Sequence, residues 1–343
     1  MKKEQVIGLI GFGRFGVLTA AILAPHFTVK VYKHKDTSEI KRNASQLGVS
    51  LVDFEEVSQC DIVVLATPMS KTEEMIKKVA PLMKSGALLL DTCSVKALPC
   101  AWLEKYAPQN IEIMGTHPMF GPVTSKFDLK KKSWQLANLQ IVLCPLRLSQ
   151  KRLSAVKKFL RTLRLEVIET TPIDHDRQNA KTLSLVHFIG RTLKATGISE
   201  QQIFTPGYTD LLRILPHTTS DNWQLFFDMN NLNHYADEVR EHFLAAAFGL
   251  EEKIIKSRST DDFAFNRSMI DRIDGQIFKL LKQRLAFAAE IGRIKKDRGL
   301  AITDIKREEE IIKKRTDSSE FDEEFVSAFY KLIFKESKKK QNI

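Results

Sequence analysis

Residues 10–16 read Ile-Gly-Phe-Gly-Arg-Phe-Gly, and this stretch decides the fold of the N-terminal part of the chain. It follows a β-branched run at residues 6–10 and opens a helical pattern. In that setting the glycines allow a tight turn, a close approach of the backbone to a pyrophosphate, and packing of the helix on the strand. Free N–H groups at the start of the helix favour an anion. We therefore expect a dinucleotide site that contains Gly11, Phe12, Gly13, Arg14, Phe15 and Gly16.

The segments around this stretch alternate short strand patterns with helical ones up to about residue 170. Strands are expected at residues 6–10, 28–32, 61–66, 87–90, 111–114 and 139–143. Such alternation indicates a mostly parallel sheet covered by helices, that is, an α/β Rossmann-type dinucleotide-binding domain at residues 1–172. Residues 173–258 have a helical pattern rich in Phe and Leu, and residues 259–343 form a third region, also with a helical pattern. We therefore expect one α/β domain followed by two all-α domains.

The end of the second strand distinguishes the two nicotinamide dinucleotides, because NAD-binding folds place an acid there for the ribose 2′-hydroxyl. Here Lys33, His34 and Lys35 occupy that position. They would attract a 2′-phosphate, so NADP is favoured, while the nearby Asp36 keeps NAD as the alternative. Two residues that follow a later strand are expected to contact the same cofactor, namely Thr67 and Pro68.

The composition is that of an ordinary globular protein, with 343 residues, 43% hydrophobic and 28% charged. No apolar run approaches the roughly 18 residues of a membrane span, and no signal-peptide pattern is present, so we expect a cytoplasmic protein without membrane contact. The four cysteines lack paired spacing and predict neither a metal site nor a disulfide framework. The net charge of +11 leaves a basic nucleic-acid-binding protein as a distant alternative, although the chain matches no nucleic-acid module.

Two further motifs follow later strands, at the sheet edge where open α/β sheets bind ligands. Residues 91–96 read Asp-Thr-Cys-Ser-Val-Lys, and residues 116–122 read Thr-His-Pro-Met-Phe-Gly-Pro. A histidine in this position is held at the crevice, where a proton acceptor is useful. A His175-Asp176 pair opens a later helix that reaches His187.

With these motifs, residues 6–253 resemble the prephenate and arogenate dehydrogenase family. The resemblance implies that His117 accepts the proton of a cyclohexadienol hydroxyl while a hydride passes to the dinucleotide and carbon dioxide leaves. Ser94 would orient the histidine or the hydroxyl, and Arg213 would bind the side-chain carboxylate of the substrate. His187 would line the same pocket, and the second domain would dimerise. No role for Lys96 follows from the resemblance.

Prephenate is favoured as the substrate because arogenate carries an ammonium group, for which a nearby carboxylate would be expected. Many relatives have an acid directly after the Gly-Pro of the histidine motif, where this chain has Val123. Plant arogenate enzymes have another acid in the stretch that is Phe-Thr-Pro here, at residues 204–206. Residues 186–191, in contrast, resemble the plant enzymes, so arogenate stays the alternative.

The last domain opens with an apolar stripe at helical spacing from Arg267 to about Arg298. At about 1.5 Å per residue this helix is a rod of roughly 48 Å, and such a rod usually packs against another chain. Arg284 and Lys295 fall on one face, whereas Arg267 lies about 25 Å before Arg284. One small ligand could contact all three only in a two-fold dimer. On spacing alone, a solvated coiled-coil face also explains these charges.

From Arg267 through Gln341 the chain resembles the all-helical class of chorismate mutase. The resemblance implies a rearrangement of chorismate to prephenate without a cofactor, catalysed by positioning and electrostatics. Arg284 and the partner's Arg267 would bind the two carboxylates of the substrate. Lys295 and Gln341 would donate to the ether oxygen, and Glu308 with the backbone of Asp304 would hold the ring hydroxyl. Two further residues would complete the polar wall, namely Arg307 and Ser337.

The sequence therefore predicts a bifunctional chorismate mutase and prephenate dehydrogenase of tyrosine biosynthesis. It is expected to act as a homodimer on chorismate and prephenate, without a nucleic-acid, membrane or metal partner. The alternative is an arogenate or cyclohexadienyl dehydrogenase whose C-terminal helices serve dimerisation or regulation without catalysis.

Overall fold

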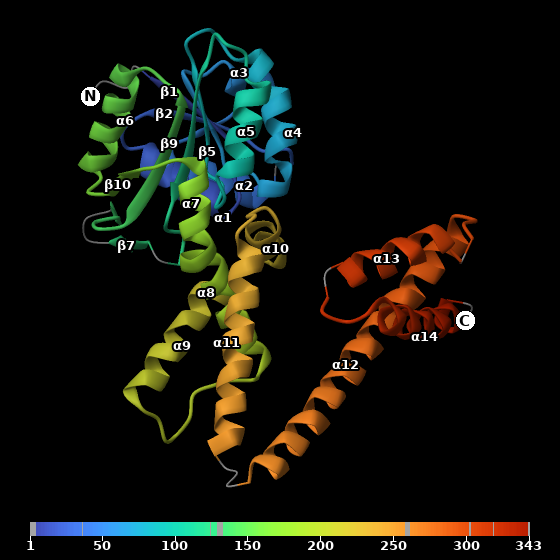
Figure 1. Ribbon diagram of the computed structural model, residues 1–343. Helices are drawn as coiled ribbons and strands as arrows, with labels where there is room; N and C mark the ends of the chain where they lie inside the picture. The colour runs from blue at the N-terminus through green and yellow to red at the C-terminus, as the bar shows by residue number, and fades with distance from the viewer. Residues whose placement is uncertain are drawn as a thin grey trace. The chain divides into compact units, whose positions relative to one another are not determined.

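A computed structural model of the chain (Figure 1) describes residues 5–35, 37–123, 125–128, 133–257, 261–301, 303–317 and 319–341. The chain forms two compact units, residues 1–245 and 246–343. The first unit contains the expected α/β domain and most of the expected second domain, and the second unit contains the expected third domain. The expected boundary at residues 258 and 259 lies outside the described residues.

An eight-stranded sheet forms the centre of the first unit, in the order β10-β9-β6-β5-β4-β1-β2-β3. Neighbouring strands are parallel except β6 and β9. The order of the first six strands is that of a doubly wound dinucleotide-binding sheet, which reverses between β1 and β4. The predicted sheet is confirmed, and β3 and β10 add an unpredicted strand at each edge. The strands are β1 (Val6–Ile10), β2 (Thr28–Tyr32), β3 (Ser50–Leu51), β4 (Ile62–Leu65), β5 (Leu88–Asp91), β6 (Glu112–Pro118), β9 (Gln140–Arg147) and β10 (Glu166–Glu169).

Helices cover both faces of this sheet (Figure 1). On one face α3 (Phe54–Ser58), α4 (Met69–Val79) and α5 (Ala97–Tyr106) pack around fully buried strand residues such as Val63 and Leu89. On the other face α1 (Arg14–Leu23), α2 (Ser38–Leu47) and α6 (Gln150–Thr162) pack around residues such as Leu9 and Leu88. Burial on both faces explains why the central strands β1, β4 and β5 are almost continuously apolar. The remaining short elements are a 3₁₀ turn (Ala80–Leu82) and the hairpin of β7 (Lys126–Asp128) and β8 (Ser133–Gln135).

Helices make up the rest of the first unit, as the sequence predicts. They are α7 (Pro172–Asn179), a π-helical turn η2 (Ala180–Ser184), α8 (Leu185–Ala195), α9 (Pro206–Thr219), α10 (Trp223–Asn231) and α11 (Ala236–Ser257), which continues into the second unit. α7 begins where the Thr171 hydroxyl accepts a hydrogen bond from the backbone N–H of Asp174 at 3.1 Å. α8 and α9 meet closely at Gly190, where a Cβ would lie 2.0 Å from Oγ1 of Thr218.

The second unit consists of α12 (Asp262–Asp297), α13 (Ile305–Asp317) and α14 (Glu323–Gln341). The predicted long helix is confirmed, and it begins at Asp262 because the Asp261 carboxylate caps it by accepting a hydrogen bond from the N–H of Phe263. α14 packs on the C-terminal half of α12, where a Cβ on Gly292 would lie 2.7 Å from Cα of Gln341. Within the described ranges, none of the helices combines the length and the hydropathy that crossing a bilayer would require.

Replacing Gly190 with alanine should lower the free energy of unfolding by about 1–3 kcal/mol, because the added methyl group would overlap Thr218 in the α8–α9 contact. Gly207→Ala is the matched control on α9, since nothing lies within 4 Å of its ideal Cβ. It should leave stability unchanged or raise it by less than about 1 kcal/mol. Urea unfolding followed by circular dichroism measures both variants, and equal stability would contradict the packing at Gly190.

Candidate active sites

The glycine-rich turn between β1 and α1 has the geometry of a phosphate cradle. Gly11 has a φ of +104°, and a Cβ there would lie 2.4 Å from the carbonyl oxygen of Ala66. A Cβ on Gly16 would lie 2.1 Å from the carbonyl oxygen of Gly11, so both positions require glycine. Gly13 faces open space and caps α1 without a side chain. The first N–H groups of α1 are thus available to an anion.

The other residues of this turn divide between the core and the surface. Phe12 is buried in one core beside α1, so it can offer a ligand only its backbone, whereas Phe15 packs against the other core and is half-buried. Nη1 of Arg14 donates a hydrogen bond to the carbonyl oxygen of Ser220 at 2.8 Å, at the end of α9. Arg14 therefore joins the turn to the helical part of the same unit.

The end of β4 adds a second wall to the cradle. A Cβ on Gly11 would lie 3.2 Å from the backbone nitrogen of Thr67, so the two loops touch at the point where the strand order reverses. Oγ1 of Thr67 is buried without a hydrogen-bond partner among the described residues, and Pro68 precedes α4 at its N-terminus. The N–H of Ser70 in the first turn of α4 donates a hydrogen bond to Oδ2 of Asp228 at 3.2 Å, so the group that fits a dinucleotide here is the unpartnered hydroxyl of Thr67.

The residues predicted to choose between NADP and NAD lie directly after β2. Lys33 is half-buried, whereas His34 and Lys35 are exposed. Asp36, on which the NAD alternative rests, lies outside the described residues.

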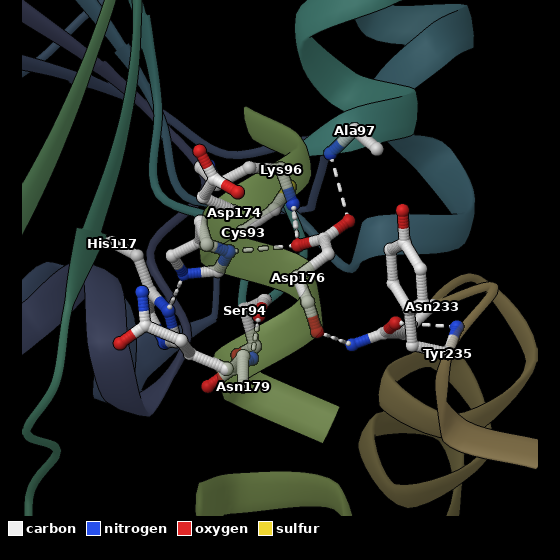
Figure 2. Close-up of polar contacts among 12 residues, drawn as sticks. Cys93, Ser94, Lys96, Ala97, His117, Asp174, Asp176, Asn179, Asn233 and Tyr235 are labelled. Carbon is white, nitrogen blue, oxygen red and sulfur yellow. Dashed lines mark hydrogen bonds and ion pairs between the residues drawn. The ribbon is translucent and has the colours of Figure 1, made fainter. Parts of the chain in front are cut away.

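A chain of hydrogen bonds holds His117, which lies near the carboxyl end of β6 (Figure 2). Nδ1 of His117 is 2.8 Å from Nε2 of His175 on α7, and Nδ1 of His175 is 2.7 Å from Oδ1 of Asp176. All three side chains are buried. The aspartate carboxylate can only accept a hydrogen bond, so Nδ1 of His175 donates, and its Nε2 is the acceptor when the ring is neutral. His117 then carries its proton on Nδ1, which leaves the lone pair of Nε2 to accept a proton.

The carboxylate of Asp176 also caps another helix. Oδ1 accepts a hydrogen bond from the backbone N–H of Lys96 at 2.7 Å, and Oδ2 accepts one from that of Ala97 at 2.9 Å. These are the first N–H groups of α5, which has no side-chain cap of its own. The backbone oxygen of Asp176 accepts a further hydrogen bond from Nδ2 of Asn233 at 2.9 Å. Asp176 thus fixes α7 against α5 while it orients His175.

Lys96 is fully buried and contacts the strand that carries His117. Its Nζ forms an ion pair with Oδ1 of Asp91 and donates to the carbonyl oxygen of Thr116 at 2.7 Å, one residue before the histidine. Burial alone would lower the pKa of Lys96, but the neighbouring carboxylate raises it above its usual value. The structure thus gives Lys96 the role that the sequence did not supply, which is to join the ends of β5 and β6.

The electrostatic surroundings keep His117 neutral. Burial is the main cause that lowers its pKa well below the usual value, and the nearby side chains of His175 and Lys96 act in the same direction. A neutral imidazole with a free Nε2 lone pair can act as a general base at neutral pH.

Ser94 follows β5 and is half-buried. Its carbonyl oxygen accepts a hydrogen bond from Nδ2 of Asn179 at 2.5 Å (Figure 2). Because His175 occupies Nδ1 of His117, a role of Ser94 in orienting the histidine could concern only the other ring nitrogen, and that role stays a prediction.

The two remaining substrate-binding candidates of this unit lie on α8 and α9. His187 is buried near Thr218, and burial is the main cause that lowers its pKa. Arg213 is 73% exposed and pairs with Asp210 at 2.7 Å. Among the described residues, no hydrogen bond links either of them to His117.

In the second unit, the structure brings several mutase candidates together around α14. Nη1 of Arg284 on α12 donates a hydrogen bond to Oγ of Ser337 at 2.6 Å, and burial lowers the pKa of this arginine. Gln341 lies one helical turn further along α14, against Gly292 of α12. Glu308 on α13 is bound by Lys338, the neighbour of Ser337 on α14. Three helices therefore converge on this cluster.

The other mutase candidates lie around it. Oδ1 of Asp304 accepts a hydrogen bond from the N–H of Arg307 at 3.0 Å at the start of α13, and the guanidinium of Arg307 pairs with Glu310 on the surface. Lys295 is half-buried on α12. Arg267 is exposed near the start of α12, with its guanidinium 4.9 Å from the ring of Phe263. It lies 17 residues before Arg284, about 25 Å along the axis.

Sequence reasoning gave no role to four residues of these sites: His175, Asp176, Lys96 and Lys338. A His-Asp pair in the first turn of a helix and a lysine in an otherwise apolar motif were the available signals. Neither of these sequence features reveals which group, distant in the sequence, the His175, Asp176 or Lys96 side chain contacts.

Comparisons with known proteins agree with this division of the chain. Residues 18–169 match the family described as prephenate dehydrogenase, nucleotide-binding domain, and residues 266–342 match chorismate mutase type II. Residues 192–263 match a third family, described as TYRAAT1-like, C-terminal domain.

Relatives of this chain include proteins named as arogenate and prephenate dehydrogenases. Arogenate dehydrogenase 1, chloroplastic, of Arabidopsis thaliana is 29% identical over 260 residues, which are 72% of this chain and 39% of that protein. A probable NADP(+) prephenate dehydrogenase of Schizosaccharomyces pombe is 24% identical over 317 residues, which are 87% of this chain and 70% of that protein. The chain thus spans well under half the length of the plant enzyme.

A solved structure shares the fold of this chain. It is prephenate dehydrogenase from Aquifex aeolicus in complex with hydroxyphenyl propionate and NAD+, with a TM-score of 0.59 and 20% identity over 79% of this chain and 98% of that one. The chain is a fusion of two families, since residues 18–169 belong to the nucleotide-binding domain of the prephenate dehydrogenases and residues 266–342 to the type II chorismate mutases.

Proposed function

We propose that this protein converts chorismate to prephenate and then oxidises and decarboxylates prephenate to 4-hydroxyphenylpyruvate. The observation that carries the dehydrogenase activity is the hydrogen-bond chain from Asp176 through His175 to His117. It leaves a neutral imidazole nitrogen at the carboxyl end of β6, in a sheet whose strand order is that of a dinucleotide fold.

The nicotinamide cofactor, when bound, supplies the hydride acceptor. As the hydride leaves the hydroxyl-bearing ring carbon, positive charge develops there and the hydroxyl becomes acidic. Nε2 of His117 takes this proton, which leaves a dienone. The electrons of the bond to the ring carboxylate then flow into the ring as carbon dioxide leaves, and the resulting phenolate recovers the proton from His117.

The buried neighbours of His117 have distinct tasks in this step. His175 and Asp176 hold the ring in one tautomer and stabilise the imidazolium that forms. Lys96 binds the backbone carbonyl of Thr116 and so fixes the position of the main chain at the next residue, His117. Ser94, His187 and Arg213 complete the substrate pocket in this proposal, and Arg213 binds the side-chain carboxylate through its planar fork.

NADP and prephenate are the proposed cofactor and substrate. Lys33, His34 and Lys35 offer positive charge to a 2′-phosphate, and the S. pombe relative is named as an NADP(+) enzyme. Val123, half-buried after the histidine motif, offers no carboxylate to an ammonium group. The plant relative is named an arogenate dehydrogenase, so arogenate is the competing substrate in the test.

The mutase activity is carried by the cluster around α14. Arg284 binds one carboxylate of chorismate. Lys295 and Gln341 donate hydrogen bonds to the ether oxygen, and Glu308 accepts a hydrogen bond from the ring hydroxyl. The partner's Arg267 binds the second carboxylate in a homodimer. Three isoleucines along the first half of α12 support this dimer, because they stay 41–57% exposed; they are Ile270, Ile273 and Ile277. Three functional domains, residues 1–172, 173–258 and 259–343, follow from the proposal.

The value of kcat/KM for prephenate should stay on its plateau as the pH falls through 6.5, the usual pKa of a histidine. Protonation of His117 removes the base, and its lowered pKa moves that loss to more acid pH. His117→Asn should lower kcat by about 10²–10⁴-fold, while the chorismate mutase activity of the same chain stays intact as the folding control. Production of reduced dinucleotide is the readout. A half-loss of activity at or above pH 6.5 would refute the assignment.

Among the four pairings of NADP or NAD with prephenate or arogenate, NADP with prephenate should give the highest kcat/KM. Lys33→Asp should reduce the preference for NADP over NAD by about tenfold or more, because it replaces attraction of the 2′-phosphate by repulsion. Lys41→Asp, on the exposed side of α2, is the matched control and should change the preference little. A higher value with arogenate would favour the arogenate dehydrogenase alternative.

Arg284→Ala should lower kcat/KM for chorismate by about 10²–10³-fold, with no effect on prephenate oxidation. Loss of chorismate absorbance, followed without dinucleotide, measures this activity. Arg293→Ala is the control, because this arginine is 75% exposed and lies nine residues further along α12, on the opposite face. If the wild-type protein does not consume chorismate, the C-terminal helices are non-catalytic.

A further inference from the structure

Two adjacent residues of α14 reach two different helices at the proposed mutase site. Ser337 accepts the hydrogen bond from Arg284 of α12. Nζ of Lys338 lies 2.9 Å from Oε1 of Glu308 and 3.1 Å from its Oε2, on α13. Neighbouring side chains on a helix point about 100° apart, which is why one turn of α14 can serve both helices. Lys338 thus belongs to the same polar cluster as Arg284 and Ser337.

The contact between Lys338 and Glu308 differs from the surface pairs of the same helix. Lys339 pairs with Glu336 within α14, and these side chains are 60% and 51% exposed. Lys338 and Glu308 are 35% and 26% exposed and join two helices. Partly buried charges are screened less by salt, so their electrostatic effects extend to a ligand beside them.

Glu308 presents a problem of charge at this site. The proposed substrate carries two carboxylates, and a third carboxylate nearby would repel it by Coulomb's law. Glu308 is nevertheless the group expected to accept the hydrogen bond of the ring hydroxyl. A cation that contacts both of its oxygens removes the net charge and fixes the orientation of the carboxylate, while each oxygen keeps a further lone pair for the hydroxyl.

We propose that Lys338 is a positioning residue of the mutase site, which neutralises Glu308 and holds it in place for the ring hydroxyl of a dicarboxylate substrate. This inference rests on the proposed mutase function. It adds Lys338 to the proposed site, as the residue whose charge allows a doubly negative substrate to bind beside Glu308.

The test measures KM and kcat for chorismate with the full-length protein and without dinucleotide. Lys338→Gln keeps a hydrogen-bond donor for Glu308 but removes the charge, so KM should rise about tenfold with kcat within about threefold of wild type. Lys338→Arg keeps the charge and should restore KM to within about threefold. Lys339→Gln, which removes a lysine from the exposed pair, is the matched control and should leave KM unchanged.

A double-mutant cycle separates charge neutralisation from a structural role. Glu308→Gln removes the charge that Lys338 neutralises, so adding Lys338→Gln to it should raise KM less than about twofold. An unchanged KM in Lys338→Gln alone would overturn the proposal. So would a full tenfold rise in the Glu308→Gln background, because Lys338 would then act independently of Glu308. Thermal unfolding of each variant identifies any change in KM or kcat that comes from an unfolded unit.

Failure of the underlying function gives a different result. If the wild-type protein oxidises prephenate but does not consume chorismate, the mutase proposal itself is refuted, and the proposal for Lys338 is refuted with it. If the wild type consumes chorismate and the cycle shows no coupling, only the inference about Lys338 is wrong.

Discussion

The hydrogen bonds to the buried carboxylate of Asp176 are the interactions on which the proposed dehydrogenase site depends. The carboxylate accepts two backbone hydrogen bonds at the start of α5 and orients His175, which in turn orients His117. Burial of a carboxylate is costly unless several donors satisfy it, and here three donors do so. One side chain thereby holds two helices together and sets the tautomer of the proposed base. Removing it would disturb packing and catalysis together.

The two proposed sites treat charge in opposite ways. Around His117, burial and the positive charge of Lys96 keep the imidazole neutral, because a base must be unprotonated before it can accept a proton. Around α14, in contrast, cationic side chains such as Arg284 must be charged to bind the two carboxylates of the proposed substrate, and Lys338 lies beside the carboxylate of Glu308. Each arrangement depends on how deeply the groups are buried, since solvent would weaken both effects.

Sequence patterns predicted much of the fold because they are local. The six expected strands, the helix opened by the His175-Asp176 pair and the long helix α12 all exist, although several of their ends differ by a few residues. β10 was not predicted, because it reads Glu-Val-Ile-Glu and its two apolar residues between glutamates give too little apolar signal. The glycine turn was identified through its backbone requirements, and these are visible in the order of residues alone.

The sequence by itself determined the strand and helix patterns, the families of the two ends of the chain and the residue types that could perform the chemistry. Only the tertiary structure decided which of these residues meet. His117 and His175 are separated by 58 positions, and Arg284 and Ser337 by 53. A hydrogen bond requires its donor and acceptor to be placed to within a few tenths of an ångström, whereas sequence periodicity specifies only the face of a helix or strand on which a residue lies. The register of packed helices and strands therefore fixed the histidine that contacts His117, the groups that bind the buried Lys96 and the lysine that contacts Glu308.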